Sequence, residues 1–139
     1  MKNIALGWNE ESIVFNYGLS EESFYLNELD CVFRRGSDIF FVEEIGETDL
    51  MPTIEVEVVK GYFKELCKVL LSTGRFVMCG KDTVLNTEKL LDYSVANNQK
   101  ILTLCFESSN ITCKFDSIEE LKQVEDLVCG FINSNQNEQ

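Results

Sequence analysis

Histidine is absent from this chain of 139 residues, and proline occurs only once. Without histidine the commonest general base is missing, and neither a Cys–His nucleophile nor a mixed Cys and His zinc site can form. The sequence also lacks a glycine-rich phosphate loop, a G-x-S-x-G nucleophile motif and an H-E-x-x-H motif. We therefore expect a protein that is not an enzyme and that uses no cofactor and no metal.

The cysteines are widely spaced and include no C-x-x-C pair. Most of them lie within apolar stretches, where a reduced thiol packs as a small hydrophobic side chain. The chain has six, at positions Cys31, Cys67, Cys79, Cys105, Cys113 and Cys129. No stretch approaches the roughly 20 apolar residues that span a membrane, and charge interrupts the N-terminal segment before a signal sequence could form. These features predict a soluble cytoplasmic protein with reduced thiols.

Basic side chains are scarce, because 12 Lys and Arg residues stand against 24 Asp and Glu residues. The imbalance is concentrated between Glu10 and Glu57, where thirteen carboxylates accompany only Arg34 and Arg35. That stretch carries a charge of −11, the difference of those two counts, within a total of −12. An uneven distribution of this kind favours a basic partner, since a uniform coat would suffice for solubility.

The length and the 45% hydrophobic content predict one α+β domain that covers residues 1–139. We expect a mainly antiparallel sheet of about six or seven strands, with two or three helices packed on one face. The acidic, strand-rich half would cover residues 1–59 and a mixed helix and strand half residues 60–133, before a polar tail at 134–139.

Three hairpins are predicted from apolar runs that flank short polar turns. They pair Ile4–Trp8 with Ser12–Tyr17, Cys31–Arg34 with Ile39–Glu43, and Lys100–Glu107 with Ile111–Phe115. Residues 20–23 fit a polar connection or a single helical turn, and residues 24–29 fit either a helix or a strand.

The remaining elements include helices recognised by their caps and their periodicity. The spacing of apolar residues predicts a helix from Lys60 to the turn at Gly74, and Ser117 with Glu120 forms a capping box for a final helix. A further helix over Glu88–Val95 would be capped by Thr87, and Phe76–Cys79 would be a short strand. Period-two alternation predicts a strand over Thr53–Val59, preceded by an acidic loop over Glu43–Pro52.

Carboxylates from this loop and strand are the candidate partner-binding groups, with two arginines as polar anchors. The full set is Glu43, Glu44, Glu47, Asp49, Glu55, Glu57, Arg34 and Arg35. A small acidic profile without catalytic motifs resembles that of bacterial toxin-neutralising immunity proteins. This resemblance implies that the chain blocks a basic, nuclease-type toxin as a monomer or a homodimer.

Two other binding functions fit the same composition. One is a nucleic-acid mimic from a phage or mobile element, whose carboxylates would stand in for phosphates on a host defence protein. The other is a cytosolic secretion chaperone, and a generic soluble domain remains a further alternative. Repulsion between the acidic segment and phosphates argues against direct binding of nucleic acid and favours a protein partner.

Overall fold

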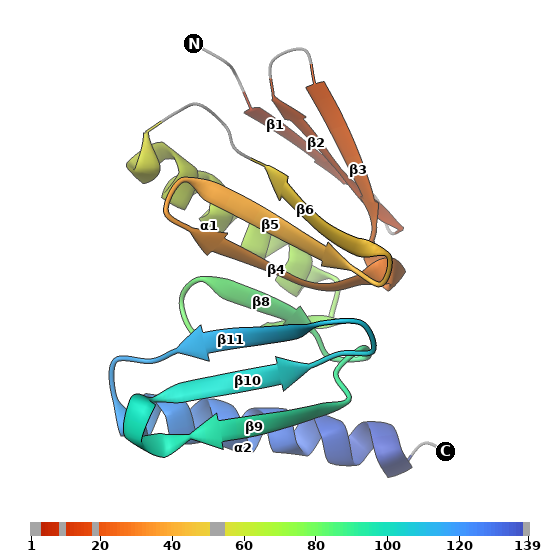
Figure 1. The fold of residues 1–139 in the computed structure, drawn as a ribbon. Coiled ribbons are helices and arrows are strands. Elements are labelled where there is room, and N and C mark those ends of the chain that lie inside the picture. Colours follow the sequence, from red (N-terminus) through yellow and green to blue (C-terminus); the bar gives the residue numbers. More distant parts are fainter. Residues whose placement is uncertain (1–3, 9–10, 18–19, 51–54, 138–139) are drawn as a thin grey trace.

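The computed structural model describes residues 4–8, 11–17, 20–50 and 55–137. These residues form eleven strands and two α-helices, and the strands assemble into three antiparallel sheets (Figure 1). The expected α+β class with antiparallel pairing is therefore confirmed. The expectation of one sheet with six or seven strands is wrong, because the strands divide among sheets of three, five and three.

The first sheet contains β1 (Ile4–Trp8), β2 (Ser12–Tyr17) and β3 (Ser20–Tyr25) in that order. The hairpin of β1 and β2 is confirmed, although Asn9 and Glu10 of its turn lie outside the described residues. The polar connection or single helical turn expected at residues 20–23 is wrong, because β3 pairs along the whole of β2. Buried Phe24 lies opposite buried Ile13, and this apolar pair fixes the register of β3 on β2. The polar residues at the start of β3 give no sign of this pairing in the sequence. A short 3₁₀ turn at Leu26–Glu28 follows.

The central sheet has the order β6-β5-β4-β8-β7. Its strands are β4 (Leu29–Arg35), β5 (Asp38–Glu43), β6 (Gly46–Leu50), β7 (Phe76–Met78) and β8 (Thr83–Asn86). The hairpin of β4 and β5 and the short strand β7 are confirmed. The acidic loop is wrong across residues 46–50, because β6 pairs with β5 there; Met51 and Pro52 lie outside the described residues.

The strand predicted at Thr53–Val59 is also wrong, because helix α1 (Val56–Ser72) begins inside it. Glu55 is the residue before the first helical turn, and its carbonyl accepts hydrogen bonds from the amides of Val58 and Val59 at 3.0 and 3.1 Å. Val56 and Val58 are exposed, whereas Val59 is buried. Alternation over so few residues does not separate a strand from a first helical turn. Thr53 and Ile54 lie outside the described residues.

The third sheet has the order β11-β10-β9, with β9 at Asp92–Ala96, β10 at Ile101–Cys105 and β11 at Asn110–Lys114. Its last hairpin is confirmed. The helix predicted at Glu88–Val95 is wrong, because Tyr93 and Val95 alternate along β9 opposite Leu104 and Leu102. Helix α2 (Ile118–Asn137) then follows, and the amide of Glu120 donates to Ser117 Oγ at 3.2 Å, which confirms the predicted cap.

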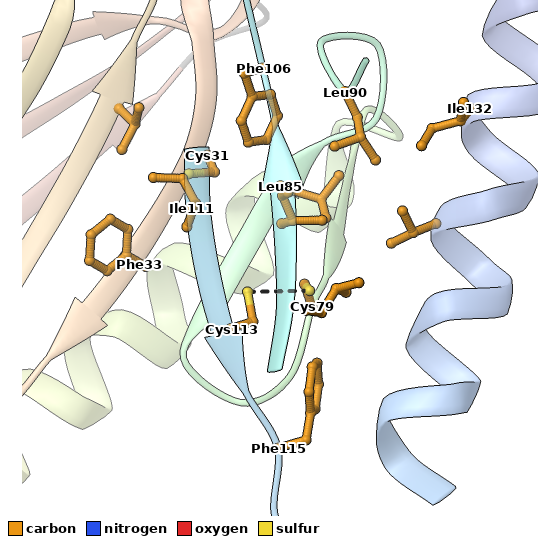
Figure 2. Packing of buried hydrophobic residues seen from close by; sticks show 14 of the residues in the cluster. Cys31, Phe33, Cys79, Leu85, Leu90, Phe106, Ile111, Cys113, Phe115 and Ile132 are labelled. Atoms are coloured by element: carbon orange, nitrogen blue, oxygen red, sulfur yellow. Dashed lines mark hydrogen bonds between the residues drawn. The ribbon is translucent and has the colours of Figure 1, made fainter. Parts of the chain in front are cut away.

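The two faces of the central sheet are buried in different hydrophobic clusters. Val32 and Phe41 face the cluster that contains Phe63 and Leu66 of α1. Cys31 and Val42 are the sequence neighbours of Val32 and Phe41, and their side chains therefore point to the opposite face. They belong to the cluster that contains residues of the third sheet and α2 (Figure 2). The helices thus do not pack on one face of a single sheet. Among the described residues, no helix is both long and apolar enough to cross a membrane.

Candidate functional site

Basic side chains gather where one end of the central sheet meets one end of the third sheet. In Figure 1 this end is on the left, at the β4–β5 turn, the β7–β8 turn and the end of β11. A cavity of about 380 Å³ is lined by the two arginines that end β4, a lysine of the β7–β8 turn and a lysine of β11. Three carboxylates, those of Asp82, Asp116 and Glu120, also line it. Lys100 lies beside them, because Ile101 pairs with Lys114 across the third sheet. We call this set the basic end: Arg34, Arg35, Lys81, Lys100 and Lys114.

Helix α1 extends the basic end with three lysines at helical spacing. Lys60, Lys64 and Lys68 line a groove of about 630 Å³ together with Arg34 and Lys81 of the basic end. The floor of this groove is apolar, and Asp82 is the one carboxylate among the described lining residues. Its apolar lining consists of Phe63, Cys67, Leu71 and Met78. An anion in this groove would meet several cations, of which Lys60 and Lys68 are also paired with exposed glutamates of α1 at 3.3 and 3.2 Å.

Arg34 fixes the relative position of the two turns. Its guanidinium donates to Asp82 Oδ1 at 2.8 Å and to the carbonyl of Gly36 at 2.6 Å, and its side chain is only 10% exposed. This pair links the β4–β5 turn to the β7–β8 turn, alongside the backbone bond from Arg34 N–H to the Asp82 carbonyl at 2.9 Å. Arg34 therefore supports the basic end more than it offers a free charge.

The other cations are more accessible. The guanidinium of exposed Arg35 lies 5.5 Å from the ring centroid of Phe33 and 6.0 Å from that of Phe40, a cation–π arrangement that orients the charge. Lys81 pairs with Asp116 at 3.5 Å, but both side chains are more than three-quarters exposed. Exposed pairs of this kind contribute little, about 0–1 kcal/mol, so an incoming anion can compete for the lysine.

Carboxylates gather at the opposite ends of the same strands. Glu28 lies near the start of β4 and Glu43 ends β5. Burial raises the pKa of Glu43, and the nearby carboxylates of Glu28 and Glu22 raise it further. Burial also raises the pKa of Asp30, an effect that Lys89 opposes and Glu44 adds to. Glu44 in turn forms an ion pair with Lys89. The acidic end therefore contains one cation, Lys89, and the basic end contains carboxylates as well. These are Asp38, which pairs with Arg35 across the hairpin, and Asp82, Asp116 and Glu120 of the cavity lining. The five cations of the basic end slightly outnumber these four carboxylates.

The structure divides the predicted acidic site between two surfaces. Glu47 and Asp49 of β6 lie opposite Val42 and Phe40, so they share the sheet face that is turned toward the third sheet. Glu55 precedes α1 and Glu57 belongs to its first turn, and α1 packs on the other face. Glu57 is also paired with Lys60 at 3.3 Å.

The remaining predicted residues lie at the two ends of the central hairpin. Glu43 and Glu44 are at its acidic end, whereas Arg34 and Arg35 are at the basic end, so these arginines do not accompany the acids. Lys81, Lys100 and Lys114 were not among the predicted site residues. A signal was present, because each adjoins a predicted strand or turn, and antiparallel hairpins bring such positions to one edge.

Metal binding finds no support in the geometry of the described residues. No group of three or more Cys, Asp or Glu side chains is placed there to hold an ion. Buried Asp30 instead lies 3.5 Å from the hydroxyl of Ser109, which donates to its Oδ2.

No family model and no curated protein matches this sequence. The fold, however, is similar to a solved structure, described as the LytTr DNA-binding domain of a putative methyl-accepting/DNA response regulator from Bacillus cereus. The alignment has a TM-score of 0.58 and covers 86% of this chain and 98% of that domain, at 8% sequence identity. At such low identity the likeness establishes the arrangement of helices and strands.

This likeness overturns the function that was expected from composition. The predicted immunity protein is contradicted, together with the toxin-inhibitor and nucleic-acid-mimic interpretations, because the fold is shared with a DNA-binding domain. The exclusion of direct nucleic-acid contact is contradicted for the same reason. Both predictions treated charge as a property of sequence segments, whereas the fold brings cations from separate segments together at one end of the sheets.

Proposed function

We propose that this protein is a non-catalytic nucleic-acid-binding domain that contacts duplex DNA through its basic end and the lysines of α1. The observation that carries the proposal is the gathering of these cations at one end of a fold similar to a LytTr DNA-binding domain. The proposal includes no reaction and no cofactor. Six free thiols also fit a reducing cytoplasm, where such a domain would meet DNA.

Phosphate contacts are the natural use of the exposed cations. Arginine and lysine side chains on turns can reach successive phosphates, and these contacts supply most of the sequence-independent affinity. Arg35 is oriented by Phe33 and Phe40, and Lys114 ends β11 at the same edge. Arg34 would serve as a positioning residue through its bond to Asp82.

The total charge of −12 does not prevent such contact. Strand β4 spans seven residues from the acidic end to the basic end, which corresponds to about 20 Å of extended chain. The Debye length is about 10 Å at 0.1 M salt, so the carboxylates at the far end act on a bound phosphate through roughly two screening lengths. The groups at the basic end then decide the contact, where five cations slightly outnumber four carboxylates, and the net charge slows encounter at low salt.

The test is fluorescence anisotropy with a labelled random-sequence duplex of about 20 base pairs, titrated at salt concentrations from about 50 to 200 mM. Arg35→Glu should weaken binding, whereas Arg75→Glu, the same charge change beyond the C-terminal end of α1, should leave it nearly unchanged. The double variant Arg35→Glu with Lys114→Glu should reduce the slope of log affinity against log salt by about two, one for each lost phosphate contact.

Circular dichroism and thermal melting of each variant separate binding from folding. Two outcomes would overturn the proposal: no binding by the folded wild-type protein at about 50 mM salt, a concentration that favours phosphate contacts, or equal losses in Arg35→Glu and Arg75→Glu. The second outcome would mean that charge in general, rather than the basic end, controls association.

A further inference from the structure

Two buried cysteines meet between the central and third sheets, next to the basic end. Cys79 Sγ–H donates to Cys113 Sγ at 3.5 Å, and Figure 2 shows the two sulfur atoms facing each other. Cys79 follows β7 at the start of the β7–β8 turn, and Cys113 belongs to β11. The pair therefore joins elements of different sheets that are 34 residues apart in sequence.

The geometry of the pair is close to that of a bond. A disulfide has an S–S length of about 2.05 Å, so the sulfurs must approach by roughly 1.5 Å. Cys79 is the first residue of a four-residue turn, where its amide donates to the Thr83 carbonyl at 2.9 Å, and Arg34 holds Asp82 at the other end of this turn. The approach therefore requires side-chain rotation at both cysteines and a small movement of the backbone at Cys79. Both cysteines line the cavity of about 380 Å³ at the basic end, which gives a small oxidant a route from solvent.

We propose that Cys79 and Cys113 are a redox-modification site, at which an oxidant of the peroxide class forms an intramolecular disulfide between the β7–β8 turn and β11. The six cysteines are all free thiols in this structure, which represents the reduced protein. Cys79 is 1% and Cys113 5% exposed, so exposure alone would not select them. Their mutual contact selects them.

The chemistry requires hydrogen peroxide and no other reactant. Cys113 sulfur attacks one peroxide oxygen, the O–O bond breaks, and Cys113 becomes a sulfenic acid while the other oxygen leaves as water. Cys79 sulfur then attacks Cys113 sulfur, the S–O bond breaks, and the hydroxyl leaves as a second water with the Cys79 proton. Two thiols and one peroxide thus give one disulfide and two waters.

The hydrogen bonds assign these roles. The bond from Cys79, together with one from Thr83, lowers the pKa of Cys113 against the effect of burial. The same bond raises the pKa of Cys79, and burial raises it further. A sulfur that accepts hydrogen bonds is the better thiolate, which makes Cys113 the first nucleophile and Cys79 the resolving thiol.

Oxidation would also act on the basic end, a consequence that rests on the proposed function. Lys81 follows Cys79 by two residues and Lys114 follows Cys113 directly. Both lysines line the same cavity as the cysteines, so a bond between the sulfurs narrows this cavity between the β7–β8 turn and the end of β11. We expect weaker binding of the duplex by the oxidised protein, with recovery on reduction.

The test is peptide mapping by mass spectrometry after treatment of the folded protein with hydrogen peroxide and alkylation of the remaining thiols. The expected product is a Cys79–Cys113 cross-linked peptide pair, with an intact mass lower by about 2 Da and reversal by dithiothreitol. Cys31→Ala, which removes the neighbouring thiol, should still form the bridge, whereas Cys113→Ala should not.

Sulfenic or sulfinic acids at Cys105 or Cys129, both more exposed, without the bridge would overturn the proposal. The cross-linked peptide pair is first sought in the wild-type protein, so a folding defect in either variant does not affect that result. Anisotropy with the labelled duplex is measured separately on the oxidised and reduced forms. A bridge that leaves binding unchanged refutes only the regulation, and failure of the reduced protein to bind refutes only the proposed function.

Discussion

Asn86 ties the central sheet to the connection between β3 and β4. It is 0% exposed, and its Nδ2 donates to the carbonyls of Leu26 at 3.3 Å and Leu29 at 3.0 Å. Its Oδ1 accepts from the amide of Glu88 at 3.0 Å. A hydrogen bond contributes about 1 kcal/mol net, so the Asn86→Ala variant should lose about 3 kcal/mol of unfolding free energy. That is a large part of the ~5–15 kcal/mol of a typical domain.

Urea unfolding followed by circular dichroism measures this loss. Asn98→Ala, at an exposed position in the 3₁₀ turn at Asn97–Gln99, is the matched control and should change stability by less than about 0.5 kcal/mol. Asn86→Asp keeps the acceptor for the Glu88 amide but places an oxygen opposite two carbonyls. It should cost at least as much as alanine at neutral pH, because the buried carboxylate has no cationic partner among these contacts.

A cost below about 1 kcal/mol for Asn86→Ala would refute the reasoning, since that is the contribution of a single bond. It would mean that the carbonyls of Leu26 and Leu29 are satisfied without the amide. Equal costs for Asn86→Ala and Asn98→Ala would lead to the same conclusion.

Two further predictions concern the carboxylate end and the β7–β8 turn. Burial raises the pKa of Asp30 above its ordinary value of 3.8, so its stabilising contribution is full below that value and is lost as pH rises through the raised one. Asp30→Asn should therefore lose less stability than the wild type between about pH 4 and 7 in urea unfolding, and an equal loss would contradict the assignment. Gly80 (φ +82°) and Gly36 (φ +64°) both adopt left-handed conformations, but only at Gly80 would a Cβ meet a neighbour, the Phe115 ring at 3.3 Å. Gly80→Ala should lower the melting temperature more than Gly36→Ala, and the reverse order would show that the ring moves without cost.

The hairpins and the final helix could be predicted because their signals are local. Arg35 to Asp38 supply turn residues between two apolar runs, and Gly36 has the positive φ that the turn needs. Ser117 and Glu120 begin α2 through a side-chain to backbone bond that the sequence spacing reveals. In both cases the residues that determine the structure are within a few positions of one another.

Strands β3, β6 and β9 could not be predicted because their partners determine them. The segment Gly46–Leu50 contains Glu47 and Asp49, and it becomes a strand because β5 offers it a complete edge. In the sequence, Leu90 and Leu91 together with Val95 have the spacing of an apolar helix face. In the structure, pairing with β10 makes residues 92–96 the strand β9, along which Tyr93 and Val95 alternate. Tertiary pairing of this kind overrides intrinsic preference, which is weak for such segments.

The site was missed for a related reason. In the sequence, Arg34 and Arg35 lie in a segment that contains thirteen acidic residues, and this segment predicts one acidic surface. Antiparallel pairing instead separates residues by the strand end at which they lie, so Arg35 is brought near Lys81 and Lys114 and kept a full strand length from Glu43. Because fields at a surface are screened within about 10 Å, the neighbours in space determine what binds. Net charge therefore affects the rate at which a partner approaches, whereas the side chains at the strand ends determine the contacts that it makes.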